Sequence, residues 1–162
     1  MSYLIAEDFT DLRVDFLHQG TATPSAGSAV DLISPASFNT DISTTSNSIV
    51  LNSGSTYYLE ASPLCTASST TANELIRFRF YDVTNNAWIG QNAEMTMNPN
   101  FSSNFRLGRR VCSALVLDSS IEAGKSIDVQ LRIEAITGSG WSFAGFPTWA
   151  GEPTIRVLQI PT

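Results

Sequence analysis

The sequence predicts an all-β protein built as an antiparallel β-sandwich. The main observation is the stretch at residues 126–135, in which the five apolar residues Ile127, Val129, Leu131, Ile133 and Ala135 alternate with polar ones. A period of two sustained over this length indicates a strand with one face on a core and one face in water. Several other short runs alternate in the same way, and no stretch has the apolar spacing of an amphipathic helix.

The composition is that of a folded domain with a weakly charged surface. A chain of 162 residues suits one domain, and its 43% hydrophobic residues are enough to form a core. Charged residues make up 15% of the chain, against about 25% in ordinary domains. The net charge of −6 argues against nucleic-acid binding, because affinity for phosphate needs clustered cations. No apolar run approaches the roughly 18 residues that cross a bilayer, so membrane insertion is not expected either.

Residues 1–48 are predicted to form an N-terminal strand followed by an extended arm. Within residues 11–17, apolar and charged residues alternate and indicate a short strand. Residues 19–48 are rich in Gly, Ser, Thr, Ala and Pro and contain few apolar anchors. This composition fits either an arm that becomes ordered on a partner surface or a disordered linker. The residues with which such an arm would make its contacts are Pro24, Val30, Leu32, Ile33 and Phe38.

Residues 49–162 are predicted to form one domain of short strands, of the jelly-roll type. Besides the stretch at 126–135, runs with strand character lie at residues 49–51, 56–62, 76–81, 87–90, 110–117 and 154–160. Clusters of Asn, Asp, Ser and Gly separate them, as expected for turns. Residues 95–107 are predicted to be a long loop. The runs at 110–117 and 154–160 are apolar on both faces, which is expected for strands inside a sandwich or an oligomer.

The polar residues do not predict an enzyme, a metal centre or a cofactor site. His18 is the only histidine, so a Ser-His-Asp or Cys-His arrangement would have to use a residue beside the flexible segment. Glu60 with Glu74 could be proposed as the carboxylate pair of a glycosidase, but solvated surface acids explain them equally well. The early aspartates lack the Asp-x-Asp-x-Asp-Gly spacing of a calcium loop.

Two cysteines and an aromatic cluster remain to be assigned. Cys65 and Cys112 are far apart in the sequence, and they fit either buried free thiols or a disulfide between two strands. The aromatic cluster fits a core, a subunit interface or a sugar-binding platform, and it consists of Trp141, Phe143, Phe146 and Trp149.

Three segments resemble a known group of domains. They are Ile49-Val-Leu-Asn-Ser-Gly-Ser-Thr-Tyr-Tyr-Leu-Glu-Ala, then Phe78-Arg-Phe-Tyr-Asp-Val-Thr, then Ser126-Ile-Asp-Val-Gln-Leu-Arg-Ile. The final Ile155-Arg-Val-Leu-Gln-Ile has the character of a terminal strand in the same group. Residues 49–160 thereby resemble the trimeric jelly-roll domains of phage tail fibres and capsid-surface proteins, which are similar in fold to complement globular heads and tumour necrosis factor. The chain departs from the group in its loop at 95–109 and in the aromatic cluster.

The resemblance implies a homotrimer with its terminal strands near the three-fold axis. The expected interface, or a displayed aromatic cluster, would use the four aromatic residues above together with Ile155 and Val157. With only residues 1–48 ahead of the domain, the expected function is a capsid decoration (cement) protein that binds the major capsid protein on the virion surface. The N-terminus has no signal-peptide pattern, so the chain is expected to be made in the host bacterial cytoplasm. The alternative is a receptor- or carbohydrate-binding knob of a tail or head fibre, and a glycan hydrolase is a more distant one.

Overall fold

The described residues form an all-β protein, as the sequence predicts. The computed structural model describes residues 13–18, 24–33, 41–67, 74–96, 108–138, 140–143 and 154–161. Within these ranges every element is a β-strand except one short 3-10 turn, η2 (Asp118–Ser120). The described part of the chain contains no helix of the length and hydrophobicity needed to span a bilayer.

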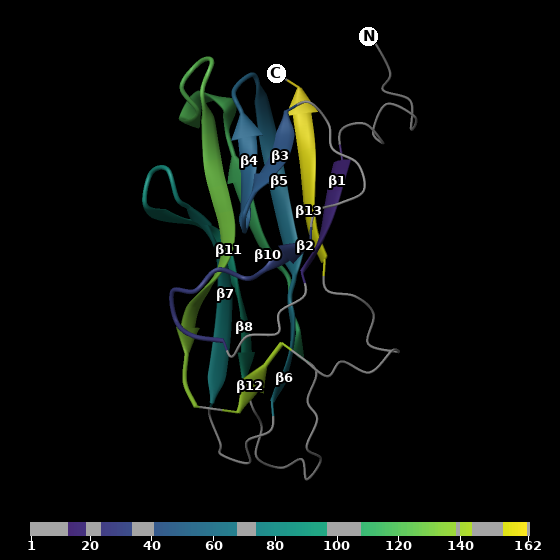
Figure 1. Ribbon diagram of the computed structural model, residues 1–162, viewed down its shortest axis with the longest axis vertical. Coiled ribbons are helices and arrows are strands. Elements are labelled where there is room, and N and C mark those ends of the chain that lie inside the picture. The colour runs from purple at the N-terminus through teal and green to yellow at the C-terminus, as the bar shows by residue number, and fades with distance from the viewer. Residues whose placement is uncertain are drawn as a thin grey trace.

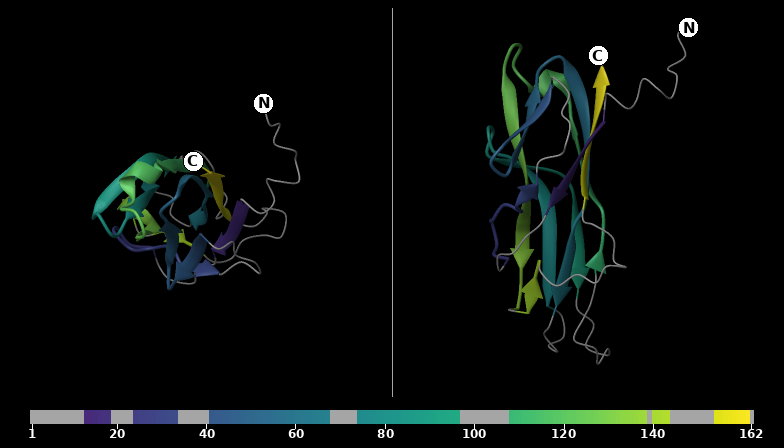
Figure 2. Two further views of the ribbon diagram at one scale, coloured as in Figure 1. Left: turned by 90° about the horizontal axis from the view of Figure 1, so that it is seen from above. Right: turned by 45° about the vertical axis from the view of Figure 1, so that its right-hand side comes forward.

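Ten strands form one curled antiparallel sheet (Figures 1 and 2). The first half of the sheet, in order, is β2 (Leu32–Ile33), β1 (Arg13–His18), β13 (Thr154–Pro161), β5 (Ser55–Ser62) and β10 (Cys112–Val116). The second half continues with β8 (Ala87–Thr96), β7 (Leu75–Asp82), β11 (Ser126–Ile136), β4 (Ser48–Asn52) and β3 (Ile42–Thr45). A small second sheet consists of β12 (Trp141–Ser142), β6 (Leu64–Ala67) and β9 (Gly108–Arg109).

The core lies inside the curl. The strand at the centre of the prediction, β11, shows the expected alternation, with Ile127, Val129, Leu131 and Ile133 buried. Its neighbour β7 contributes Phe78 and other inward residues, and β5 alternates in the same way. Burial of each such side chain stabilises the fold by about 1.5–3 kcal/mol, so these alternating faces hold the sheet in its curl.

The two halves of the sheet meet at one point, where β8 approaches β10. The only register pair between these strands is Gln91 with Ser113. Gly90, beside this pair, has a φ of 69°, and a Cβ atom there would lie 2.0 Å from the Ser113 carbonyl oxygen. The strand can come this close only because residue 90 has no side chain.

Side-chain hydrogen bonds join the two ends of the curled sheet. The Asn47 amide, in the turn between β3 and β4, donates to the Asp31 carboxylate at 2.9 Å and accepts from the Leu32 N–H at 3.2 Å. Elsewhere, buried Gln159 of β13 donates to Asp41, which precedes β3, at 2.6 Å. These bonds fix the edge strands β2 and β3 against each other without a backbone ladder between them.

Residues 24–33 are docked on the body of the chain, where the sequence predicts an extended arm. Val30 donates its N–H to the Leu131 carbonyl at 2.8 Å, and Gly27 donates to the Ile133 carbonyl at 2.8 Å. The segment thereby occupies the edge of β11 beyond the end of β4, which pairs only with residues 126–129. Backbone pairing and the burial of Val30 therefore fold this part of the predicted arm onto the chain itself.

One other expectation about strands is corrected, and a second is met within the single chain on one face only. Strand β8 runs on to Thr96, so Met95 is a buried strand residue and the rest of the predicted loop, 97–107, lies outside the described residues. Strand β13 buries one face within the single chain: Ile155, Val157 and Gln159 point inward, and Ile160 is exposed, so burial of its second face in an oligomer stays a prediction. Because Gln159 is polar and points inward, the alternation of β13 cannot be recognised in the sequence.

Candidate functional site

The outer face of β10, β5 and β13 is the most apolar exposed surface of the described residues. The inward residues of β5 are Tyr57, Leu59 and Ala61, so Tyr58 and its alternate neighbours point outward. On β10 the inward residues are Cys112, Ala114 and Val116. The large hydrophobic residues left in solvent are Val111 (54% exposed), Leu115 (57%), Leu117 (50%) and Ile160 (43%).

The strand register places outward side chains of the three strands in one row. Leu115 lies opposite Tyr58, and Tyr58 lies opposite Leu158 of β13. Residues paired across neighbouring strands share a face, so these three side chains form a continuous band over three strands. Ile160, opposite Thr56, lies one step further along the same face.

A polar row borders the apolar band. Ser113 lies opposite Glu60, which lies opposite Arg156 of β13. The Tyr58 hydroxyl lies 3.5 Å from a Glu60 carboxylate oxygen. Contiguous exposed apolar area with a polar rim is typical of protein–protein interaction sites. We call this surface, made of Tyr58, Leu115, Leu117, Leu158 and Ile160 with its polar rim, the outer apolar face.

Of the residues predicted for a trimer interface, those that the structure describes lie on the opposite side of these strands or elsewhere in the core. Ile155 and Val157 are completely buried in the chain's own core, so they are not available to a second subunit. Trp141 is also buried and donates its indole N–H to the Thr137 carbonyl at 3.0 Å. Phe143 packs on Phe78 with 5.9 Å between ring centroids.

Of that predicted set, Phe146 and Trp149 lie outside the described residues. The strand predicted for the interface, β13, does contribute to the outer apolar face, but through Leu158 and Ile160. Neighbouring residues of a strand point to opposite faces, so Ile155 and Val157 face the core whereas Leu158 and Ile160 face outward.

Of the residues predicted for capsid contact, the structure also describes only some. Pro24 and Val30 are buried, and Leu32 packs against the core. Ile33 belongs to β2, which pairs with β1. Phe38 lies outside the described residues. Those of the five whose side chains are described therefore contact the chain's own body.

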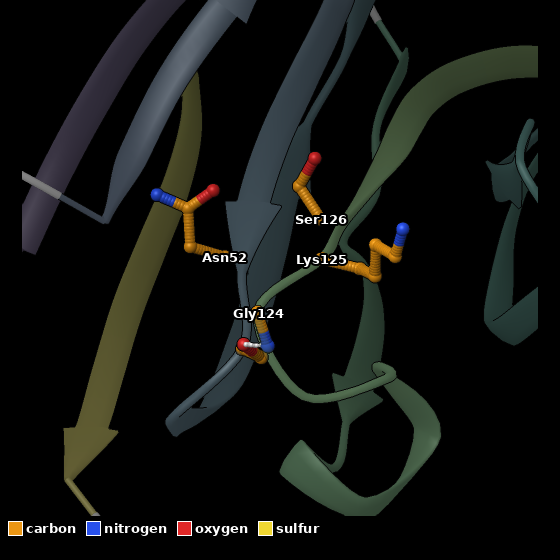
Figure 3. Close-up of a pocket in the computed structure, with 5 residues that line it drawn as sticks. Asn52, Gly124, Lys125 and Ser126 are labelled. Carbon is orange, nitrogen blue, oxygen red and sulfur yellow. Dashed lines mark hydrogen bonds between the residues drawn. The ribbon is translucent and has the colours of Figure 1, made fainter.

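A shallow hollow of about 520 Å³ lies between the β4–β5 turn and the loop before β11 (Figure 3). The Gly124 N–H donates to the Ser53 hydroxyl at 2.8 Å, and the Ser53 N–H donates to the Lys125 carbonyl at 2.9 Å. Figure 3 shows the side chains of Asn52 and Lys125 pointing away from each other. The polar groups here tie two loops together and do not converge on a common point.

The two cysteine thiols lie in environments that suppress their reactivity. Cys65 and Cys112 are free thiols, both completely buried. Burial raises the pKa of each thiol to about 12, and only the thiolate is a good nucleophile. The Cys65 sulfur lies 3.6 Å from the Met95 sulfur, within the core. These thiols serve as packing groups in the interior.

The carboxylates considered for glycoside hydrolysis are separated by the fold. Glu60 lies on the outer apolar face, whereas Glu74 is buried at the start of β7. Glu74 packs over Gly138, where a Cβ atom would lie 2.0 Å from the Glu74 carboxyl carbon. Among the described residues, no three His, Cys, Asp or Glu side chains are grouped closely enough to hold a metal ion.

A scan against protein-family models finds no match to this chain, and a search of curated proteins finds none.

Proposed function

We propose that the chain is a capsid decoration protein of a phage: a homotrimeric jelly roll that binds the assembled shell and stabilises it. The outer apolar face supports the homotrimer, and the resemblance of residues 49–160 to phage capsid-surface domains supports the virion assignment. The major capsid protein would be the partner, and the virion surface the location.

The strand order supports the jelly-roll part of the proposal. Five strands, in the order β2-β1-β13-β5-β10, and five more, in the order β8-β7-β11-β4-β3, are joined by a single register pair between β10 and β8. Two antiparallel sheets that exchange strands in this way are the pattern of a jelly roll. The terminal strand β13 lies between β1 and β5, inside the first sheet.

The outer apolar face supports self-association. It lies on the sheet that contains the terminal strand, where the resemblance places the three-fold axis. Burial of apolar surface contributes about 25 cal/mol per Å², and Leu115, Leu117 and Ile160 of this face are between 43% and 57% exposed in the single chain. A second copy would remove this apolar area from water, and its polar rim would fix the register of contact.

Stabilisation of the shell follows from linkage. A trimer that binds the assembled capsid and not its separate subunits lowers the free energy of the assembled state by RT ln(1 + [L]/Kd). The contribution at each site is about 2.7 kcal/mol when the free trimer is at a hundred times its Kd.

The first test is the oligomeric state of the wild-type chain and of Leu115→Glu, measured by sedimentation velocity. We expect a trimer for the wild type and monomers for the variant, because a charge at the centre of the outer apolar face would be buried without a partner. Ser43→Glu, at an exposed position of β3, is the matched control and should leave the trimer intact. A monomeric wild type, or a trimeric Leu115→Glu, would contradict the proposal.

The second test is the number of copies of this chain per purified virion, measured by quantitative gel against the major coat protein. Hundreds of copies would support a decoration protein, and virions stripped of it should lose their genome at a lower temperature. A handful of copies would move the chain to a fibre or tail tip, and none would remove it from the virion.

A further inference from the structure

The sheet half opposite the outer apolar face carries three arginines on its outer surface. Two of them are paired with carboxylates: Arg77 with Glu94 at 2.5 Å and Arg79 with Glu134 at 2.9 Å. Arg132 makes no ion pair with any carboxylate of the described residues. It is therefore the one arginine of this cluster whose charge is left without a carboxylate partner within the described part of the chain.

The Arg132 side chain is held in place by neutral partners. Its Nε–H donates to the Gln130 side-chain oxygen at 2.7 Å, and its guanidinium lies 4.0 Å from the centre of the Tyr81 ring. Gln130 is in turn fixed by the Ser48 hydroxyl at 2.9 Å. The terminal N–H groups make no hydrogen bond within the described residues. An arginine fixed in this way has already lost most of its conformational freedom and can bind a carboxylate through two parallel hydrogen bonds.

An aromatic side chain lies beside this cation. Trp88, in β8, is opposite Tyr81 and partly exposed, and the two rings meet edge-on with 4.9 Å between centroids. The Tyr81 hydroxyl donates to the Asn86 side chain in the same hairpin. Trp88 and Arg132 belong to strands on either side of β7, and because both side chains lie against the Tyr81 ring, at 4.9 Å and 4.0 Å from its centre, the indole and the guanidinium are at most about 9 Å apart. This distance suits a ligand of one or two sugar rings.

Acidic residues on this surface limit how much negative charge a bound ligand can carry. On the outer face of β11, Asp128 lies two residues before Gln130, and Glu134 lies two residues after Arg132. Glu94 lies on the same face, paired with Arg77. The three carboxylates balance the three arginines, so no excess of positive charge remains for a polyanion such as a nucleic acid or an acidic peptide, whereas a ligand with one negative charge can pair with Arg132.

We propose that Arg132, Gln130, Tyr81 and Trp88 form a binding site for a saccharide unit that carries a single carboxylate, such as a uronic acid. The carboxylate binds the terminal N–H groups of Arg132, and the apolar face of the sugar ring packs on the Trp88 indole. The ring hydroxyls lie within reach of the Gln130 and Asn86 amides. The site is on the opposite sheet half from the outer apolar face, so the proposal does not depend on the homotrimer.

The test is a titration of the full chain with methyl β-D-glucuronide, followed by NMR of the Arg132 Nε–H and the Trp88 indole N–H. We expect both signals to shift with a Kd in the millimolar range. Methyl β-D-glucoside, which carries a neutral hydroxymethyl group in place of the carboxylate, should bind at least tenfold more weakly. Arg132→Gln and Trp88→Ala should each weaken glucuronide binding at least tenfold, and Arg110→Gln, at an exposed position outside the site, should leave it unchanged.

The outcomes that would overturn the proposal are equally specific. If neither signal moves at about 50 mM glucuronide, a concentration well above a Kd of about 1 mM, the site does not bind this class of ligand. If acetate or a capped aspartate peptide binds as well as the glucuronide, the ligand is a simple carboxylate and the sugar is not recognised. The wild-type titration decides the matter even if a variant fails to fold.

Discussion

Gly90 shows how a single residue determines whether the two halves of the sheet can meet. At this position the backbone has a φ of 69° and lies against the backbone of Ser113 and Ala114. The Arg79 Nε–H donates to the Gly90 carbonyl at 3.0 Å, which holds the approach in place from the neighbouring strand. The contact is between two backbones, so neither side can move aside to make room for a methyl group.

Replacing Gly90 with alanine should therefore lower the free energy of unfolding by about 3 kcal/mol, from left-handed strain and overpacking together. Gly124→Ala is the matched control: its φ is 73°, but nothing lies within 4 Å of the added Cβ atom, so only the strain of about 1 kcal/mol should appear. Urea unfolding followed by tryptophan fluorescence measures both. Equal losses in the two variants would mean that the close approach to β10 does not matter.

At the scale of elements, the segment at residues 24–33 is the clearest difference between expectation and structure. Its composition is that of a flexible segment, yet Val30 is 1% exposed and its backbone pairs with β11. The edge of β11 beyond residue 129 would otherwise present unpaired N–H and C=O groups beside a buried core. Covering that edge supplies the stabilisation that composition alone does not predict.

Amide hydrogen exchange should reveal this docking. The amides of Gly27 and Val30, which donate to β11, should exchange far more slowly than in an unstructured peptide of the same sequence. The Ile133 amide, which donates to the Ser28 carbonyl at 3.0 Å, should be protected together with them. Val30→Ala should lower the protection of all three, because it removes a buried anchor. If these amides exchanged at unprotected rates in the wild-type chain, the docking would be contradicted and the interpretation of an extended arm would stand.

At the scale of the whole molecule, stability should depend on pH in the alkaline range through three buried acids. Burial raises the pKa of Cys65 and Cys112 to about 12, from 9.0. Burial, together with Asp41, raises the pKa of Tyr57 to about 12, from 10.0. All three groups stay protonated in the folded protein, whereas the unfolded chain releases the two thiol protons above about pH 9 and the Tyr57 proton above about pH 10.

The free energy of unfolding should thus be fully present below pH 9 and fall as the pH rises toward 12. Each group that titrates only in the unfolded chain contributes a slope of about 1.4 kcal/mol per pH unit. Urea midpoints from pH 7 to pH 11 measure this decline. A Cys65→Ala/Cys112→Ala variant should show a shallower decline that begins nearer pH 10, where Tyr57 alone remains. An identical profile in the two proteins would show that the thiols are not the cause.

The sequence by itself determined the all-β class, the strand at residues 126–135 and most of the other long strands, because alternation of apolar and polar residues directly reports which face meets the core. It also indicated that residues 110–117 carry apolar side chains on both faces, which is the signal of the outer apolar face. It could not assign that signal to Leu115 and Leu117, because a pattern that is apolar on both sides does not say which side is inside.

Only the tertiary structure decided the inward direction of Ile155 and Val157, the docking of residues 24–33 and the grouping of Arg132 with Tyr81. Each of these depends on which strands become neighbours and in what register, and that is set by contacts between residues far apart in the chain. Gln159 is the clearest case: as a polar residue it is expected outside, but Asp41 and Ser55 satisfy its amide in the interior. A buried partner supplied by a distant segment cannot be recognised in a local pattern, and for this reason the alternation of β13 is hidden in the sequence at Gln159.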